Sequence, residues 1–347
     1  ELADNTHYYA TQTINTCESV DRLDVLVTIN NPPTQPQITD SEKWLSYSIS
    51  EDYFVMAIKV DGSLWGWGKN FNQQLGITTA EQPYQPTLLT QMIGWKTVST
   101  GKEFSLALKN DGTLWRLNVG GTWQQVGAES DWASISTGSK HAILLKTNGT
   151  LWGIGKNLDG QVGDGTQATR ILPVQIGSDT WTNIAAGSDF SLARKADGTI
   201  WAWGNNSSGQ VGDGTTTSRL SPVKIGTAID WKSVFANGVT SYAIKNNGTL
   251  WGWGYLHYGS SQTKSPQQFD FATDWLAVST GGEHTLGLKN NGTLWSWGSN
   301  NLGERGVGTY SDTPNNTPQQ VGADTDWTTS DAGAHQHICL KTDGTLW

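Results

Sequence analysis

Short apolar runs separated by glycine-rich polar turns make up most of the chain. Segments such as WKTVSTG at 95–101 and FSLALK at 104–109 alternate or run apolar with β-branched residues, and GTLWGWG at 248–254 alternates again. Asp-Gly or Asn-Gly between such segments supplies the positive φ angles that a tight hairpin turn needs. No segment of any length shows apolar residues at helical spacing. The pattern therefore predicts an all-β protein built from short antiparallel strands.

One phrase of eight residues that ends in tryptophan occurs seven times. A second tryptophan lies 20 residues before the last tryptophan of each copy, except in the first copy, where the spacing is 21. Successive copies lie 37 to 52 residues apart, a period near that of propeller blades. The copies are IKVDGSLW (58–65), LKNDGTLW (108–115), LKTNGTLW (145–152), RKADGTIW (194–201), IKNNGTLW (244–251), LKNNGTLW (288–295) and LKTDGTLW (340–347).

Each complete unit continues beyond the phrase in a recognisable way. A glycine-punctuated loop follows, best preserved as GKNLDGQVGDGT at 155–166, and then a short strand opened by proline, as in LPVQIG at 172–177. Proline at the start of a strand costs no ladder hydrogen bond. Four short antiparallel strands in each of seven units predict a seven-bladed β-propeller at 44–347, with the last blade truncated.

These motifs carry a resemblance to a known family. The patterns W-x-x-V/I-x-x-G, L-K-x-D/N-G-T-L-W-x-W-G and G-x-N-x-x-G-Q-V-G-D-G-T recur together at one spacing from about Pro36 to Trp347. In this the chain resembles the regulator of chromosome condensation repeat family, in its tryptophan-rich bacterial form. The resemblance implies a seven-bladed propeller that acts through contacts with other proteins, as a nucleotide exchange factor, a plant photoreceptor and a β-lactamase inhibitor of this kind do.

The first 43 residues differ in character from the repeats. Residues 1–31 end in an alternating run and resemble the last strands of an immunoglobulin-like module of bacterial secreted proteins, whose remainder we expect upstream. Residues 32–43 read as a linker that contains one more proline strand, QPQI at 35–38, placed before Trp44 as the other proline strands precede their tryptophans. We therefore expect an N-terminal strand clasp that closes blade seven.

Composition and charge exclude several classes of partner. The formal net charge is -9 without any basic run, which argues against nucleic acid. No stretch is apolar enough to span a membrane. Cys17 and Cys339 have no further thiol or histidine at metal-ligand spacing, so we expect no metal and no cofactor. The repeat explains the residues that a catalytic constellation would need, so we expect no catalytic residues.

Positions that break the repeat are the better candidates for function. They fall in the segments 71–89, 116–125, 255–264 and 304–316. Aromatic side chains, histidine and arginine in these segments are of the kinds enriched at binding hot spots, although plain loop variation explains any one of them as well. The candidate binding residues are Tyr84, Trp123, Tyr255, His257, Tyr258, Arg305 and Tyr310.

The sequence favours a non-enzymatic binding module over an enzyme. We expect a secreted or cell-surface part of a larger multidomain bacterial protein, possible cargo of the type IX secretion system, which binds a protein or glycan through its irregular blade loops. A further partner would be the secretion or surface-anchoring machinery. The alternatives are a passive spacer or adhesin stalk, an exchange-factor-like regulator and a propeller enzyme.

Overall fold

The chain divides into two compact units, residues 1–42 and 43–347. The computed structural model describes residues 43–77, 82–102, 104–117, 121–256 and 262–347, together with the backbone of four short strands in the first unit. There β1 (Thr6–Ala10) pairs antiparallel with β4 (Leu23–Val27), and β2 (Thr13–Ile14) pairs with β3 (Cys17–Glu18). The immunoglobulin-like assignment remains a prediction, and the expected clasp strand at 35–38 lies outside the described residues.

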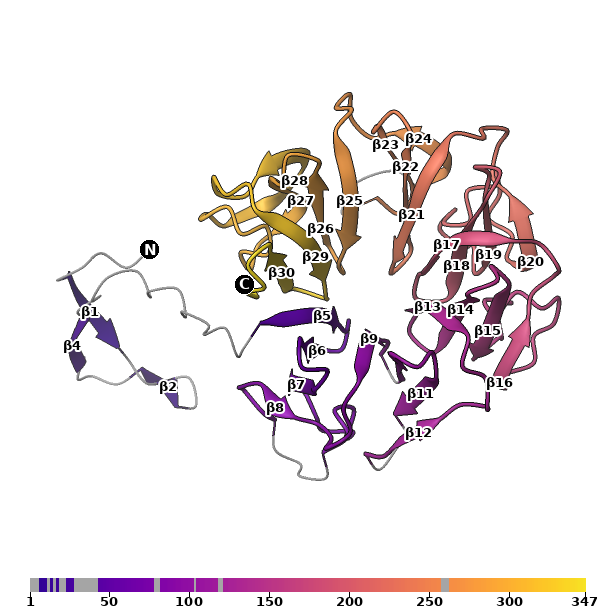
Figure 1. The fold of residues 1–347 in the computed structure, drawn as a ribbon. Helices are drawn as coiled ribbons and strands as arrows, with labels where there is room; N and C mark the ends of the chain where they lie inside the picture. Colours follow the sequence, from indigo (N-terminus) through magenta and orange to yellow (C-terminus); the bar gives the residue numbers. More distant parts are fainter. Residues whose placement is uncertain are drawn as a thin grey trace. The chain divides into compact units, whose positions relative to one another are not determined.

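The second unit is a ring of antiparallel sheets, as Figure 1 shows. Each repeat begins with an inner strand that starts at the first repeat tryptophan. These inner strands are β5 (Trp44–Ile49), β9 (Trp95–Thr100), β13 (Trp132–Thr137), β17 (Trp181–Ala186), β21 (Trp231–Asn237), β25 (Trp275–Thr280) and β29 (Trp327–Ala332). The second strands, which carry the first half of the phrase, are β6 (Phe54–Lys59), β10 (Ser105–Lys109), β14 (His141–Lys146), β18 (Phe190–Lys195), β22 (Thr240–Lys245), β26 (His284–Lys289) and β30 (His337–Lys341).

Two further strands complete the first six repeats. The third strands follow the Asp-Gly or Asn-Gly turn and are β7 (Leu64–Gly68), β11 (Leu114–Leu117), β15 (Leu151–Gly155), β19 (Ile200–Gly204), β23 (Leu250–Gly254) and β27 (Leu294–Asn300). The outer strands are β8 (Thr87–Leu88), β12 (Trp123–Gln125), β16 (Arg170–Gln175), β20 (Arg219–Lys224), β24 (Thr263–Gln268) and β28 (Ser311–Gln320). The described residues contain no helix, and hence none that could cross a membrane.

The structure has six four-stranded blades, not the seven that the repeats predict. In the last repeat β29 and β30 form a two-stranded sheet, and Leu346 adds only an isolated bridge to Leu340. Three residues follow the Asp-Gly turn of this repeat, which is enough for one bridge and too few for a third strand. The number of full blades was therefore overestimated, although the all-β propeller with antiparallel four-stranded blades is confirmed.

Hydrogen bonds between neighbouring inner strands tie the ring together. In five of the seven inner strands the side chain of the fifth residue accepts a hydrogen bond from a backbone N–H of the next repeat. The bonds run from Thr100 N to Ser48 Oγ (3.0 Å), Thr137 N to Ser99 Oγ (3.1 Å), Ala186 N to Ser136 Oγ (2.9 Å), Ala332 N to Ser279 Oγ (2.8 Å) and Ile49 N to Asp331 Oδ2 (2.9 Å). The last of these joins the seventh repeat to the first, so Asp331 closes the ring in the position that serine holds in the first, second, third and sixth repeats.

The core lies between neighbouring blades, where each sheet packs on the next. Trp95, for example, is fully buried among Phe54, Met56 and Leu64 of the first blade. The inner strands approach so closely at one end that glycine is required there: a Cβ on Gly101 would lie 2.3 Å from the carbonyl oxygen of Gly138. Close packing of flat sheets around a ring leaves room only at the two faces and in the central channel.

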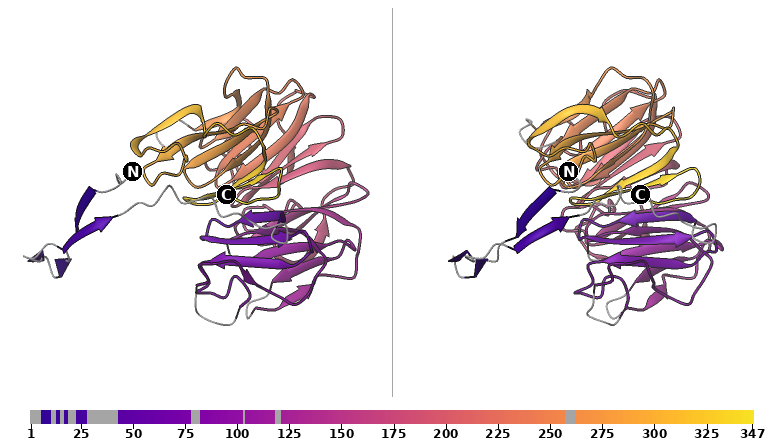
Figure 2. Two further views of the ribbon diagram at one scale, coloured as in Figure 1. Left: turned by 60° about the vertical axis from the view of Figure 1, so that its left-hand side comes forward. Right: turned by 90° about the vertical axis from the view of Figure 1, so that its left-hand side faces the viewer.

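The two faces of the ring differ in construction (Figure 2). We call the first the channel-mouth face: there each inner strand ends, the turn to the second strand lies, and the long loop between third and outer strands begins. We call the second the hairpin face, because it carries the Asp-Gly and Asn-Gly turns of the phrase. The described parts of the four irregular segments connect third strands to outer strands and so contribute to the channel-mouth face.

Candidate functional site

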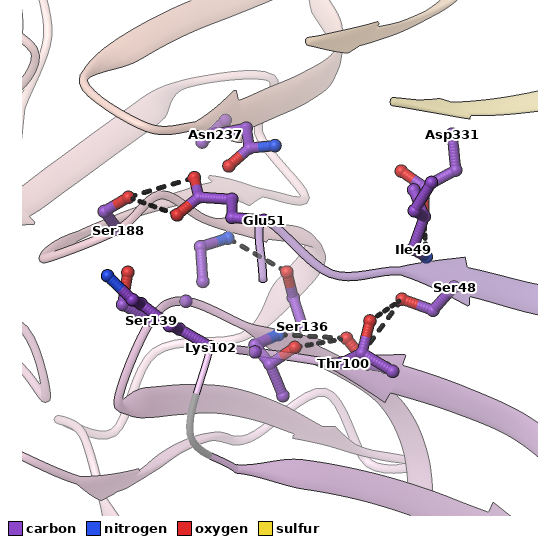
Figure 3. A pocket seen from close by; sticks show the side chains of 16 residues that line it. Ser48, Ile49, Glu51, Thr100, Lys102, Ser136, Ser139, Ser188, Asn237 and Asp331 are labelled. Carbon is purple, nitrogen blue, oxygen red and sulfur yellow. Dashed lines mark hydrogen bonds between the residues drawn. The ribbon is translucent and has the colours of Figure 1, made fainter. Parts of the chain in front are cut away.

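A polar cavity of about 150 Å³ opens where the inner strands end on the channel-mouth face. Its wall consists mainly of serine and threonine hydroxyl groups and turn backbone from six of the seven repeats, as Figure 3 shows. The charged groups that reach it are Glu51, Lys102 and Asp331. The cavity is therefore the entrance of the central channel, lined by groups that form hydrogen bonds.

Glu51 reaches across this entrance. Ser188 Oγ of the fourth blade donates to its two carboxylate oxygens at 3.1 and 3.3 Å, and Gly238 N of the fifth blade donates to Oε1 at 3.2 Å. In Figure 3 the side chain projects from the end of β5 toward Ser188. Carboxylate hydrogen bonds to neutral donors are stronger than bonds between neutral groups, so Glu51 links opposite sides of the ring.

The turn that carries Glu51 is one residue longer than its counterparts. Its sequence is SISEDYF at 48–54, whereas the second blade has STGKEF at 99–104 and the third has STGSKH at 136–141. Ser50 occupies the position that glycine holds in those blades, and its hydroxyl donates to the carbonyl of Gly101 at 2.9 Å. The extra residue lifts Glu51 away from the strand and into the channel entrance.

The same turn holds Tyr53 in a left-handed conformation, with a φ angle of 63°. Such a conformation is uncommon for a residue with a Cβ and costs on the order of 1–3 kcal/mol. The ring of Tyr53 stacks on His335 of the seventh repeat, with centroids 6.2 Å apart and planes 23° from parallel. Tyr53 and His335 occupy equivalent positions in their repeats, so the strained turn builds an aromatic contact across the ring closure.

His335 also faces the sixth blade. Its Nδ1 lies 3.4 Å from Oε1 of Glu304, whose side chain is completely buried and whose other oxygen accepts from Leu302 N at 2.9 Å. In the third blade the equivalent residue is Gln161, which donates to Asp189 of the following blade at 2.9 Å. The junction of the sixth and seventh repeats thus has a carboxylate-to-imidazole contact where the junction of the third and fourth blades has an amide-to-carboxylate hydrogen bond.

Asp331 is enclosed by the inner strands, although it keeps some access to the channel. Besides Ile49 N, its carboxylate accepts from Ser279 Oγ at 3.1 Å. Desolvation in the channel wall raises the pKa of this carboxyl group from 3.8 to about 6, against the opposing effect of the hydrogen bonds that it accepts. Both acidic side chains of the entrance thus serve as acceptors that connect blades.

The predicted binding residues fall into three groups. Tyr84 and Tyr310 lie on the channel-mouth face with exposed fractions of 85% and 76%, and Tyr255 is half-buried. His257 and Tyr258 lie outside the described residues.

Trp123 and Arg305 are buried rather than on the surface, which corrects their prediction as contact residues. Trp123 fills the core of the shortened second blade beside Trp95, at a centroid distance of 5.1 Å. Arg305 occupies the core position that Val162 holds in the third blade, and burial lowers the pKa of its guanidinium group.

The hairpin face is uniform by contrast. In every repeat the lysine of the phrase lies over the rings of both repeat tryptophans; Lys195 Nζ, for instance, is 5.0 Å from the centroid of Trp181 and 3.8 Å from that of Trp201. In five repeats an aspartate pairs with the same ammonium group, as Asp179 does with Lys195 at 2.8 Å. These cations are engaged within their own repeats, which favours packing over anion binding.

Sequence reasoning missed Glu51 and Tyr53, and it identified His335 only as a turn residue open to solvent. The signal was present: the tryptophan spacing of 21 residues in the first repeat, against 20 in the others, marks the added residue. The spacing alone could not show that the added residue enters the channel, because that depends on how seven turns meet.

Comparison with known proteins agrees with this geometry. Two family models described as the regulator of chromosome condensation (RCC1) repeat match the chain, one at residues 61–108, 148–194 and 197–240, the other at 132–161, 181–210 and 275–304. No curated protein matches the chain by sequence.

Solved structures share the fold at low sequence identity. Human WBSCR16 matches with a TM-score of 0.77 and 19% identity over 86% of this chain and 87% of that one. Prp20p of Saccharomyces cerevisiae matches with a TM-score of 0.72 and 17% identity over 86% and 83% of the two chains. The ectodomain of the Arabidopsis thaliana receptor kinase ACR4 matches with a TM-score of 0.53 and 14% identity over 88% and 94%. The repeats, the ring of blades and the family models together show that this chain belongs to the RCC1 repeat family.

Proposed function

We propose that the propeller is a non-enzymatic binding module whose protein partner docks on the channel-mouth face. The observation that carries the proposal is the contrast between the faces. The hairpin face repeats one lysine–tryptophan arrangement, whereas the channel-mouth face gathers the added residue of the first turn, the strained Tyr53 and the irregular loops. Strain and irregularity that stability does not require are typical of sites under functional selection.

Exposed aromatic side chains support the same face. Of the described aromatic residues with large exposure, Tyr53, Phe71, Tyr84 and Tyr310 lie on the channel-mouth face, while Phe271 and Trp347 lie toward the hairpin face. Tyrosine and phenylalanine are enriched in protein–protein interfaces because they offer a large contact area at small entropic cost. Among proteins of this fold, Prp20p is described by its binding properties to Gsp1p and histones, which makes a protein partner the first choice.

Site-specific photo-crosslinking in the producing cells tests the proposal. A benzoylphenylalanine in place of Tyr310 or Tyr84 should yield defined protein adducts, while the same probe in place of Phe271 should yield none. A glycan array with the intact propeller is the second arm. If neither face yields adducts and the propeller binds glycans, the partner is a glycan and not a protein. If neither crosslinking nor the array gives a signal, the propeller is a passive spacer.

We propose further that the module acts outside the cell or at its surface, as cargo of the type IX secretion system. The character of residues 1–31 motivates this proposal, and the ACR4 ectodomain is an extracellular example of the fold. Immunodetection of the protein in culture medium, surface-protease-treated cells and cytoplasm tests it. Protease-protected protein confined to the cytoplasm would refute it.

A further inference from the structure

We infer that the partner is recognised through a basic side chain that enters the channel entrance beside Glu51. The residues that flank this side chain in the partner pack on the rim formed by Tyr53, His335, Leu302 and Tyr310. This inference rests on the proposed function and specifies its site and its partner chemistry. We call this rim, which spans the sixth, seventh and first repeats, the closure rim.

A chain of contacts links the members of the closure rim. Tyr53 stacks on His335, and His335 faces Glu304. The backbone N–H of Leu302 donates to the same glutamate, which fixes the tip of the sixth blade's loop. The ring of Tyr310 lies over the next residue, with its nearest atom 3.1 Å from where a Cβ on Gly303 would stand.

The rim exposes apolar area that the fold does not use. Leu302 is 64% exposed, Tyr310 76% and Tyr53 46%, although Tyr53 is held in a strained conformation. Because Tyr53 gains so little burial in the free protein, packing does not offset the cost of its strained backbone. The geometry is accounted for if contact with a partner supplies the missing burial.

The charge at the entrance points to a cation. Glu51 holds its carboxylate at the wall of the opening formed by Ser188 and Gly238, and Asp331 lines the same opening. The donors to Glu51 are a hydroxyl and a backbone amide, neither of which neutralises its charge. Lys102 is the one positive side chain lining the described entrance, and the chain as a whole carries a net charge of -9.

The size of the cavity fits a side chain rather than a folded element. Its volume of about 150 Å³ is that of a few water molecules, which the head group of one lysine or arginine would replace. The hydroxyl groups of Ser139 and Ser188 at the same opening are acceptors for its remaining N–H groups. The partner segment is therefore expected to cross the entrance in extended form and insert a single cation.

Selection from a random peptide library displayed on phage tests this directly. Binders of the intact propeller should be enriched in lysine or arginine at one position flanked by apolar residues. A synthetic binder should lose at least tenfold in affinity when its basic residue is changed to norleucine, and should lose a similar factor against the Glu51→Gln propeller. Tyr53→Ala should weaken binding less and independently of the charge.

Matched controls lie on the hairpin face, namely Glu129→Gln for the charge and Phe271→Ala for the exposed aromatic ring. Both should bind as the unaltered propeller does. Binders without a basic residue, or binding equally strong to Glu51→Gln, would overturn the inference. If such binders still crosslinked to a probe at position Tyr310, the proposed function would stand and only the role of the basic side chain would be refuted. If no peptide and no protein bound the channel-mouth face, the proposed function and this inference would both be refuted.

Discussion

The carboxyl group of Asp331 makes closure of the ring dependent on pH, with a sign opposite to that of most aspartates. Its pKa is raised from 3.8 to about 6 by desolvation. A carboxyl group whose pKa is higher in the folded than in the unfolded state binds its proton more tightly when folded. Its contribution to the free energy of unfolding therefore grows as pH falls through 6 and is complete below 3.8. Two pKa units correspond to about 3 kcal/mol, and contact with channel water reduces this to about 1–3 kcal/mol.

The substitution Asp331→Ser isolates this effect, because serine holds the same position in other repeats. A serine hydroxyl should accept from Ile49 N as Ser48 Oγ accepts from Thr100 N. We expect the free energy of unfolding of the unaltered protein, measured by urea titration with tryptophan fluorescence, to exceed that of the variant by about 0.5–1.4 kcal/mol more at pH 5 than at pH 8, since less than half of the full effect is reached one pH unit below the raised pKa. Because the two proteins share the same histidines, the contribution of histidine titration to the free energy of unfolding cancels in this difference. Two neighbouring groups do not interfere, because burial raises the pKa of Cys339 to about 12 and that of Tyr47 still further.

A third variant separates charge from hydrogen bonding. Asp331→Ala leaves Ile49 N without an acceptor and should cost about 1–3 kcal/mol relative to Asp331→Ser at every pH. Equal pH dependence in the unaltered protein and in Asp331→Ser would show that this carboxyl group does not titrate near 6. Equal stability of the serine and alanine variants would show that the bond to Ile49 does not hold the ring closed.

Three further predictions concern the repeats themselves. Lys195→Ala should lower the free energy of unfolding by about 1–2 kcal/mol through loss of its contacts with two indoles, and Lys195→Met, which keeps the stem, should recover part of it in urea titrations. Gly101→Ala should cost more than about 2 kcal/mol, because its Cβ meets the carbonyl of Gly138, and a differential-scanning trace without a lowered melting temperature would refute that close approach. Asp164 already accepts from Thr166 and an arginine, so added calcium or chelator should leave the melting temperature unchanged, while Asp164→Ala should lower it.

The repeat made the blades predictable because it fixes local structure. Each inner strand starts at the tryptophan that the spacing marked, and each hairpin turns at its Asp-Gly or Asn-Gly. The pattern failed where the outcome depends on contacts between repeats. Trp123 looked like an irregular loop residue, but the shortened second blade folds it back on Trp95 as part of the outer strand. Arg305 occupies the motif position of Val162 in the third blade. That this position is buried follows only from the structure, where Val162 lies in the core.

A ring of near-identical blades explains why the candidate site sits where it does. Similar hydrogen bonds between inner strands recur at several junctions, so the ring tolerates the loss of one regular turn. The first turn departs from the pattern by one residue, yet Ser50 still reaches Gly101 and Glu51 reaches the far wall. Stability could have been served by the shorter glycine turn of the other blades, which needs no strained tyrosine. The added residue therefore makes most sense as a binding feature at the junction between the first and last repeats.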